Sequence, residues 1–133
     1  MSSPINPKQV KSFVQNTLGC TCPEAVFKKQ EFDSGITINN IKNCKKLCVG
    51  ERLLIYLKNA ESVSDLPSSI TSLVSEGRRE RDSRGLNRFR LVLGAKDVDL
   101  ISKEAKTIFE GFNDLDGKVH LHVVSMKKID KLQ

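Results

Sequence analysis

From residue 51 onward the chain alternates apolar strands with amphipathic helices, and this alternation restricts the fold more than any other feature. Apolar runs at 52–57, 88–93 and 118–124 have the length and composition of strands. Between them, apolar residues recur at helical spacing over 66–74 and 98–112. The order strand, helix, strand, helix, strand predicts right-handed crossovers and a largely parallel sheet, so we expect an α/β fold.

The two helices between these strands carry different signals. Asp97 is a good N-cap, and the helix after it has an apolar stripe of Val98, Ile101, Ala105, Ile108, Phe109 and Phe112. The helix that Asp65 opens contains Gly77, a poor helix former. We therefore expect this helix either to stop at Gly77 or to continue to Gly85.

Residues 1–34 are predicted to form a pair of helices. Asn6 and Pro7 are typical of a helix start, and Gly19 is typical of a helix end. Cys22 and Pro23 then start a second helix, expected to end near Phe32. The first two cysteines would lie at the corner between the helices.

Residues 35–41 alternate apolar and polar side chains and are predicted to pair antiparallel with 52–57, across a loop that contains Cys44 and Cys48. The expected architecture is a four-stranded mixed sheet. With 133 residues, the chain has the size of one domain. We therefore expect one α/β domain over 1–133, with the helix pair at 1–34 and a β-β-α-β-α-β unit at 35–133.

All the cysteines fall in two short clusters, Cys20 with Cys22 and Cys44 with Cys48. Four thiolates can complete a tetrahedral zinc site or hold an iron–sulfur cluster. The spacings C-x-C and C-x3-C differ from the paired C-x2-C pattern of zinc sites. The leading hypothesis is a binding or adaptor module with one zinc ion on these four residues. The alternatives are an iron–sulfur cluster, or no cofactor and plain packing of the thiols.

A second hypothesis assigns chemistry to the first cluster alone. A thiol at a helix N-terminus has its thiolate stabilised by the helix dipole, which singles out Cys22. In this interpretation Cys20 and Cys22 form the working pair of a thiol redox or transfer protein.

The run Thr17–Phe27 contains Gly19-Cys20-Thr21-Cys22-Pro23-Glu24 and ends on Val26-Phe27. It resembles a G-C-x-C-P-E-E-V-F signature of small, functionally uncharacterised microbial proteins, with Ala25 in place of the second Glu. The resemblance implies no activity. It does imply that the corner between the two predicted helices is a unit.

A third hypothesis rests on six arginines between residues 78 and 90: Arg78, Arg79, Arg81, Arg84, Arg88 and Arg90. Guanidinium groups bind phosphates well, so this run is a candidate site for nucleic acid or a phosphorylated ligand. The chain has no Trp and one Tyr, which disfavours base stacking. The alternative is a solvated helix face in which Glu80 and Asp82 pair with arginines four residues away.

The remaining features restrict the partner and the compartment. A net charge of +6 favours an acidic protein or a nucleic acid as partner. No secretory signal or membrane span is present in the sequence, so a cytoplasmic protein without a membrane partner is expected. His120 and His122 share one face of the last strand and are predicted to be surface residues without a ligand. The common phosphate-loop, dinucleotide, zinc-protease and serine-hydrolase motifs are absent from the sequence.

Overall fold

A computed structural model describes residues 30–38, 41–50, 52–60, 63–112 and 119–130. Its elements are β1 (Gln30–Ile38), β2 (Ile41–Val49), β3 (Leu53–Asn59), the 3-10 turn η3 (Val63–Asp65), α2 (Leu66–Ser83), β4 (Arg88–Ala95), α3 (Val98–Glu110), β5 (Val119–Ser125) and α4 (Met126–Asp130).

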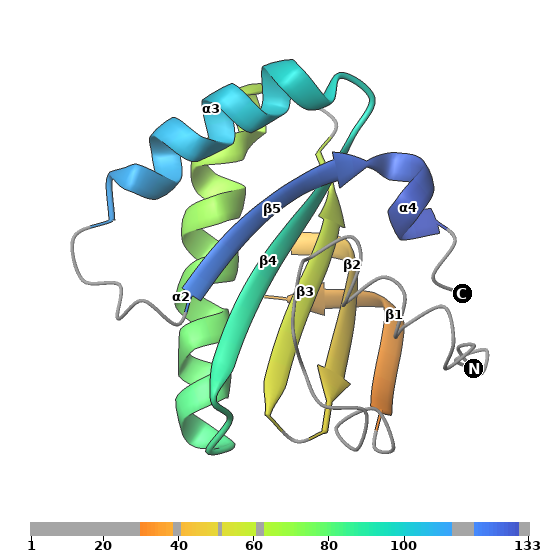
Figure 1. Cartoon of the computed structure of the whole chain (residues 1–133), viewed down its shortest axis with the longest axis vertical. Coiled ribbons are helices and arrows are strands. Elements are labelled where there is room, and N and C mark those ends of the chain that lie inside the picture. Colours follow the sequence, from red (N-terminus) through yellow and green to blue (C-terminus); the bar gives the residue numbers. More distant parts are fainter. Residues whose placement is uncertain (1–29, 39–40, 51, 61–62, 113–118, 131–133) are drawn as a thin grey trace.

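The described strands form one mixed sheet in the order of the sequence, β1-β2-β3-β4-β5 (Figure 1). The first two pairings, β1 with β2 and β2 with β3, are antiparallel. The last two, β3 with β4 and β4 with β5, are parallel. The parallel strands are joined by crossovers that contain α2 and α3, as the alternation in the sequence predicts.

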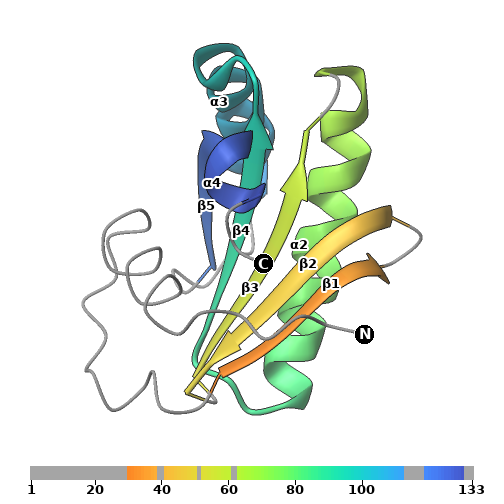
Figure 2. The same ribbon diagram turned by 90° about the vertical axis from the view of Figure 1, so that its right-hand side faces the viewer.

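Helix α2 runs along one side of the sheet (Figure 2), and α3 belongs to the same buried layer. The strand order advances in one direction, so crossovers of the same hand place both helices on the same face. The apolar side of α2 consists of Leu66, Ile70, Leu73 and Val74, all buried. From α3, Ile101 and Ala105 complete this layer. We call this side of the sheet the helix face.

Gly77 lies where α2 packs directly on Phe89 of β4. A Cβ atom added to Gly77 would lie 2.2 Å from Cζ of Phe89 in β4. The ring of Phe89 also meets Tyr56 of β3 edge to face, with ring centroids 4.9 Å apart. The absence of a side chain at residue 77 is what lets α2 lie directly on this aromatic pair.

The opposite side of the sheet is also apolar in its central strands. Leu47, Ile55 and Val92 point away from the helix face and are fully buried. Helix α4 packs on this side, with Ile129 close to Gly94 of β4. We call this side the α4 face.

The sequence predicted the second half of the fold well. The mixed α/β class, the strands at 88–93 and 118–124, and the helices after Asp65 and Asp97 are confirmed. The helix that contains Gly77 continues through it to Ser83. The N-terminal helix pair lies largely outside the described residues.

Three predictions about residues 30–57 are wrong. Gln30–Ile38 is a strand, so the second predicted helix cannot extend to Phe32. The loop expected around Cys44 and Cys48 is strand β2. Because β2 lies between β1 and β3, the first strand does not pair with residues 52–57, and the described sheet has five strands instead of four.

Among the described residues, no helix is both long enough and apolar enough to span a membrane.

The contact between Gly77 and Phe89 generates a stability prediction. Gly77→Ala improves helix propensity by up to about 1 kcal/mol, but it forces a methyl group into the Phe89 ring, and such overpacking costs about 1–3 kcal/mol. We expect the variant to have a lower free energy of unfolding than the wild type. Urea denaturation followed by circular dichroism measures the change.

Ser75→Ala is the matched control, because residue 75 is exposed on the same helix. It should be neutral or stabilise by a few tenths of a kcal/mol. Combining Gly77→Ala with Phe89→Leu should reduce the penalty, since the smaller side chain leaves room for the methyl group. A Gly77→Ala protein that is more stable than wild type would contradict the close packing.

Candidate functional site

Cys44 and Cys48 are core residues of β2, and both side chains are buried. The Cys44 thiol donates to the backbone carbonyl of Ile41, with an Sγ–O distance of 3.3 Å. Burial raises the pKa of Cys44 above its ordinary value, although Lys58 acts in the opposite direction. The thiol is therefore protonated at neutral pH, which disfavours Cys44 as a nucleophile.

The spacing of these cysteines along β2 matters for the predicted metal site. Four residues of strand separate Cα atoms by about 13 Å. Two thiolates bound to one zinc ion lie only about 4 Å apart, and a disulfide needs Cα atoms within about 7 Å. Cys44 and Cys48 therefore cannot both bind one zinc ion or form a disulfide with each other while β2 is intact.

The other half of the predicted set, Cys20 and Cys22, lies outside the described residues. Within the described ranges, no three His, Cys, Asp or Glu side chains are grouped as metal ligands. Metal binding or thiol chemistry at Cys20 and Cys22 stays a prediction. The four-cysteine zinc site does not fit the strand that holds Cys44 and Cys48.

The six arginines of the run do not form one surface. Arg79 pairs with Glu76, Arg81 with Asp82 at 3.0 Å, and Arg84 with both Glu31 and Glu80 at 3.0 Å. Arg78 lies on the same helix. Arg88 and Arg90 belong to β4 and point to the α4 face, because their neighbours Phe89 and Leu91 point to the helix face.

Glu80 is the centre of the polar contacts between α2 and the sheet. Its carboxylate accepts hydrogen bonds from the Tyr56 hydroxyl, from Lys46 Nζ at 3.1 Å and from Arg84 Nη1 at 3.0 Å. Burial acts to raise the pKa of Glu80, but the three donors outweigh it and hold the pKa below 4.5. Burial and the bond to Glu80 raise the pKa of Tyr56, so its phenol stays protonated. The charges of α2 are thus largely neutralised by local partners.

On the α4 face, β4 and β5 bring four basic side chains together. Arg90 is directly opposite His120 in the parallel register. Arg90 Nη1 donates to His122 Nε2 at 2.8 Å. Arg88 lies two residues before Arg90 on the same strand face and is exposed. We call Arg88, Arg90, His120 and His122 the basic cluster.

Electrostatics within the basic cluster disfavour further positive charge. Burial, followed by Arg90 and His120, lowers the pKa of His122 to about 4. Burial, followed by Arg90 and Arg88, lowers the pKa of His120. The pKa of Arg90 is lowered by burial and by Arg88. Since a guanidinium group has no acceptor, His122 must be neutral, with Nε2 accepting and the proton on Nδ1.

No protein-family model, curated protein or solved structure matches this chain. The resemblance of residues 17–27 to the C-x-C-P signature stays a prediction, as does an adaptor role. The conclusion about function depends on the side chains of the described residues.

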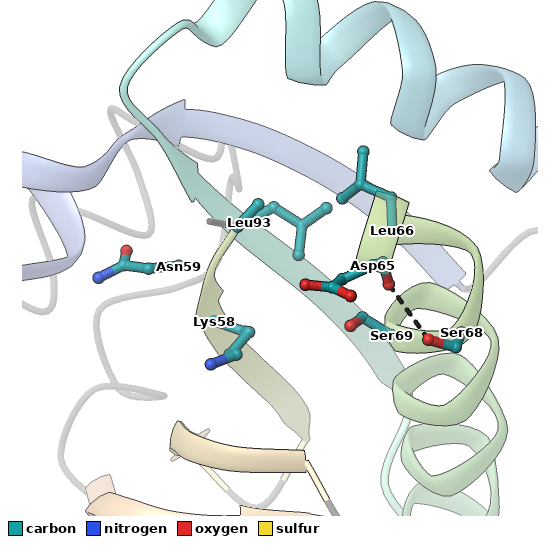
Figure 3. A pocket seen from close by; sticks show the side chains of 8 residues that line it. Lys58, Asn59, Asp65, Leu66, Ser68, Ser69 and Leu93 are labelled. Atoms are coloured by element: carbon teal, nitrogen blue, oxygen red, sulfur yellow. Dashed lines mark hydrogen bonds between the residues drawn. The ribbon is translucent and has the colours of Figure 1, made fainter. Parts of the chain in front are cut away.

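A second candidate site is the carboxyl edge of the parallel strands, where open α/β sheets commonly bind ligands. A cavity of about 160 Å³ lies between the end of β3 and the start of α2. Figure 3 shows Asp65 and Ser69 at the start of α2, directed toward the end of β3, which carries Lys58 and Asn59. The Ser68 hydroxyl donates to the Asp65 carbonyl at 3.3 Å.

Sequence reasoning found the members of the basic cluster separately but did not join them. It placed Arg88 and Arg90 with the helix arginines, and it interpreted the histidines as isolated. The signal in the sequence was the i, i+2 spacing of the two arginines and of the two histidines, which places each pair on one strand face. A crossover connection makes the two strands neighbours in a parallel sheet. The carboxyl-edge cavity left no comparable signal, because its lining residues come from the ends of β3 and β4 and from the start of α2.

The Glu80 contacts predict a pH dependence of stability. The folded-state pKa of Glu80 lies below its unfolded value, so the stabilisation by the carboxylate is present above about pH 4.5 and lost as the pH falls through the lower folded value. We expect Glu80→Gln to destabilise the protein at pH 7 and to differ less from wild type near pH 3. Urea unfolding midpoints at pH 7, 5 and 3 measure this difference.

Glu110→Gln is the control, since residue 110 is exposed at the end of α3. It should change the midpoint little at each pH. A Glu80→Gln penalty that is the same at pH 7 and pH 3 would contradict a role for the ionised carboxylate.

Proposed function

We propose that this protein is a binding module for a phosphate-bearing ligand, which it takes through the basic cluster on the α4 face. The observation that carries the proposal is the convergence of Arg88, Arg90, His120 and His122 from two adjacent strands. Burial, followed by the positive charge of neighbouring members of the cluster, lowers the pKa values of Arg90, His120 and His122. An anion bound there would relieve this repulsion.

The distribution of charge over the molecule supports the same conclusion. On the helix face, cations such as Lys46 and Arg84 meet the carboxylates of Glu80 and Glu31. On the α4 face, the charged side chains that the described strands contribute are all basic. Among the charged side chains of the described strands, those on the α4 face therefore form the basic side of the sheet.

The parts of the basic cluster suit distinct tasks in phosphate binding. A guanidinium group donates in a planar fork that matches two phosphate oxygens. The bond to His122 orients the buried Arg90 group, while Arg88 and His120 are more accessible. Neighbouring strands are about 5 Å apart and alternate residues about 7 Å apart, which suits one or two phosphate groups.

The cluster would recognise phosphate and not bases. Stacking of single-stranded bases needs aromatic rings beside the phosphate contacts, but the basic cluster contains no Phe, Tyr or Trp, and Tyr56 is buried on the helix face. A small phosphate ester and a nucleic-acid backbone would present the same chemistry to the cluster. The two differ in the salt dependence of binding, because a polyanion releases several counterions.

We expect pyrophosphate to bind at low salt and to raise the pKa of His120, since a nearby anion stabilises the imidazolium form. Histidine resonances followed by NMR as a function of pH, with and without pyrophosphate, measure this shift. Arg88→Gln should weaken binding about threefold to tenfold, the range for loss of one partly exposed charge pair. A short single-stranded oligonucleotide, titrated in parallel at several salt concentrations, distinguishes the polyanion from the small phosphate.

Arg79→Gln is the matched control, because Arg79 pairs with Glu76 on α2. It removes the same charge from the helix face and should leave binding unchanged. If Arg79→Gln weakened pyrophosphate binding as much as Arg88→Gln, the loss would reflect the net charge of the protein and not the basic cluster. That result would contradict the proposal. So would histidine resonances that neither probe shifts at millimolar concentration.

A further inference from the structure

The carboxyl edge of the sheet holds a larger cavity beside the one between β3 and α2. Its volume is about 550 Å³, within the range of roughly 300–1,000 Å³ found for small-molecule sites. The two cavities share Asn59 and Ala60 in their walls. The larger one is lined by Asn59, Ala60, Val63, Lys96, Asp97, Leu100, Ile101 and Met126.

Much of this wall is apolar, and it includes exposed apolar side chains. Val63 is 37% exposed and Leu100 46% exposed, the large apolar residues that remain most open to solvent among those described. Both line the larger cavity, together with Ile101 and Met126. A ligand that covers Val63 and Leu100 would remove their apolar surface from water, which favours binding by about 25 cal/mol per Å².

The charged groups of the wall have different roles. The Asp97 carboxylate accepts from the backbone N–H of Leu100 at 3.1 Å, so its charge stabilises the start of α3. Lys96, the preceding residue, is exposed and makes no ion pair with a residue that the structure describes. An acidic group on a ligand would meet this ammonium at the rim of an otherwise apolar hollow.

We infer that the larger cavity binds a small organic acid with an apolar body, held by Val63 and Leu100 and paired with Lys96. This site is separate from the basic cluster: it lies where β3 and β4 end, whereas Arg88 is at the start of β4. It uses other residues and selects a different chemical class of ligand. The inference does not depend on the phosphate-binding proposal.

The probe for the test is 8-anilinonaphthalene-1-sulfonate, which combines an aromatic body with a sulfonate and gains fluorescence in apolar sites. We expect saturable binding to the folded wild-type protein, with amide NMR shifts at residues 60, 96 and 100. Lys96→Gln should weaken binding about threefold to tenfold through loss of the charge pair. Leu100→Ala should weaken it by a similar factor through loss of apolar contact.

Lys103→Gln is the charge control, because residue 103 is exposed on α3 and is not in the cavity wall. It should leave binding unchanged. The uncharged analogue N-phenyl-1-naphthylamine should bind the wild type more weakly than the sulfonate and should not respond to Lys96→Gln.

Three results would overturn the inference. The first is equal weakening by Lys103→Gln and Lys96→Gln. The second is binding of the uncharged analogue as tight as that of the sulfonate. The third is a set of NMR shifts confined to Arg88 and the histidines, which would assign the sulfonate to the basic cluster. Because NMR reports the two places separately, failure at one site is distinguishable from failure at the other.

Discussion

The close contact of α2 with the sheet is the constraint on which the rest of the structure depends. It requires a residue without a side chain at position 77, above the ring of Phe89. With the helix at that distance, Glu80, one turn further along α2, reaches Tyr56 and Lys46. The close approach of the α2 backbone to β4 at Gly77 thus determines both the packing of Tyr56 and Phe89 and the polar contacts beside them.

The same contact determines which side of the sheet each arginine of β4 occupies. Because Phe89 faces α2, strand alternation directs Arg88 and Arg90 to the other side, where the histidines of β5 also point. Arg79, Arg81 and Arg84 meet carboxylates. Arg90 of β4 meets His122 instead. A run that is continuous in the sequence is therefore divided between two faces of the sheet, with carboxylate partners on the helix face and histidine neighbours on the α4 face.

Local patterns were sufficient for the second half of the fold. Asp97 acts as the N-cap that its position predicts, and Ile101 and Ala105 of the apolar stripe after it are buried. The rest of the stripe is partly buried against the core. Local patterns failed in β2, because Lys46 and the two cysteines give no clear alternation of apolar and polar side chains. Lys46 is tolerated on the helix face because Glu80 of α2 neutralises it, and Cys44 and Cys48 are buried there as small apolar residues. Such tertiary compensation cannot be inferred from a window of neighbouring residues.

The mixed strand directions also bear on how the molecule folds. The antiparallel strands β1, β2 and β3 follow one another through short connections, so their contacts are local in sequence. The parallel pairs form only after α2 and α3 have closed long loops, whose entropy cost precedes any gain from pairing. Gly77 and Phe89 are joined by the short connection from α2 to β4, so their contact is local in sequence and does not need the loop between β3 and β4 to close. We therefore expect it to form early, and a residue that obstructs it would chiefly slow folding and leave the unfolding rate almost unchanged.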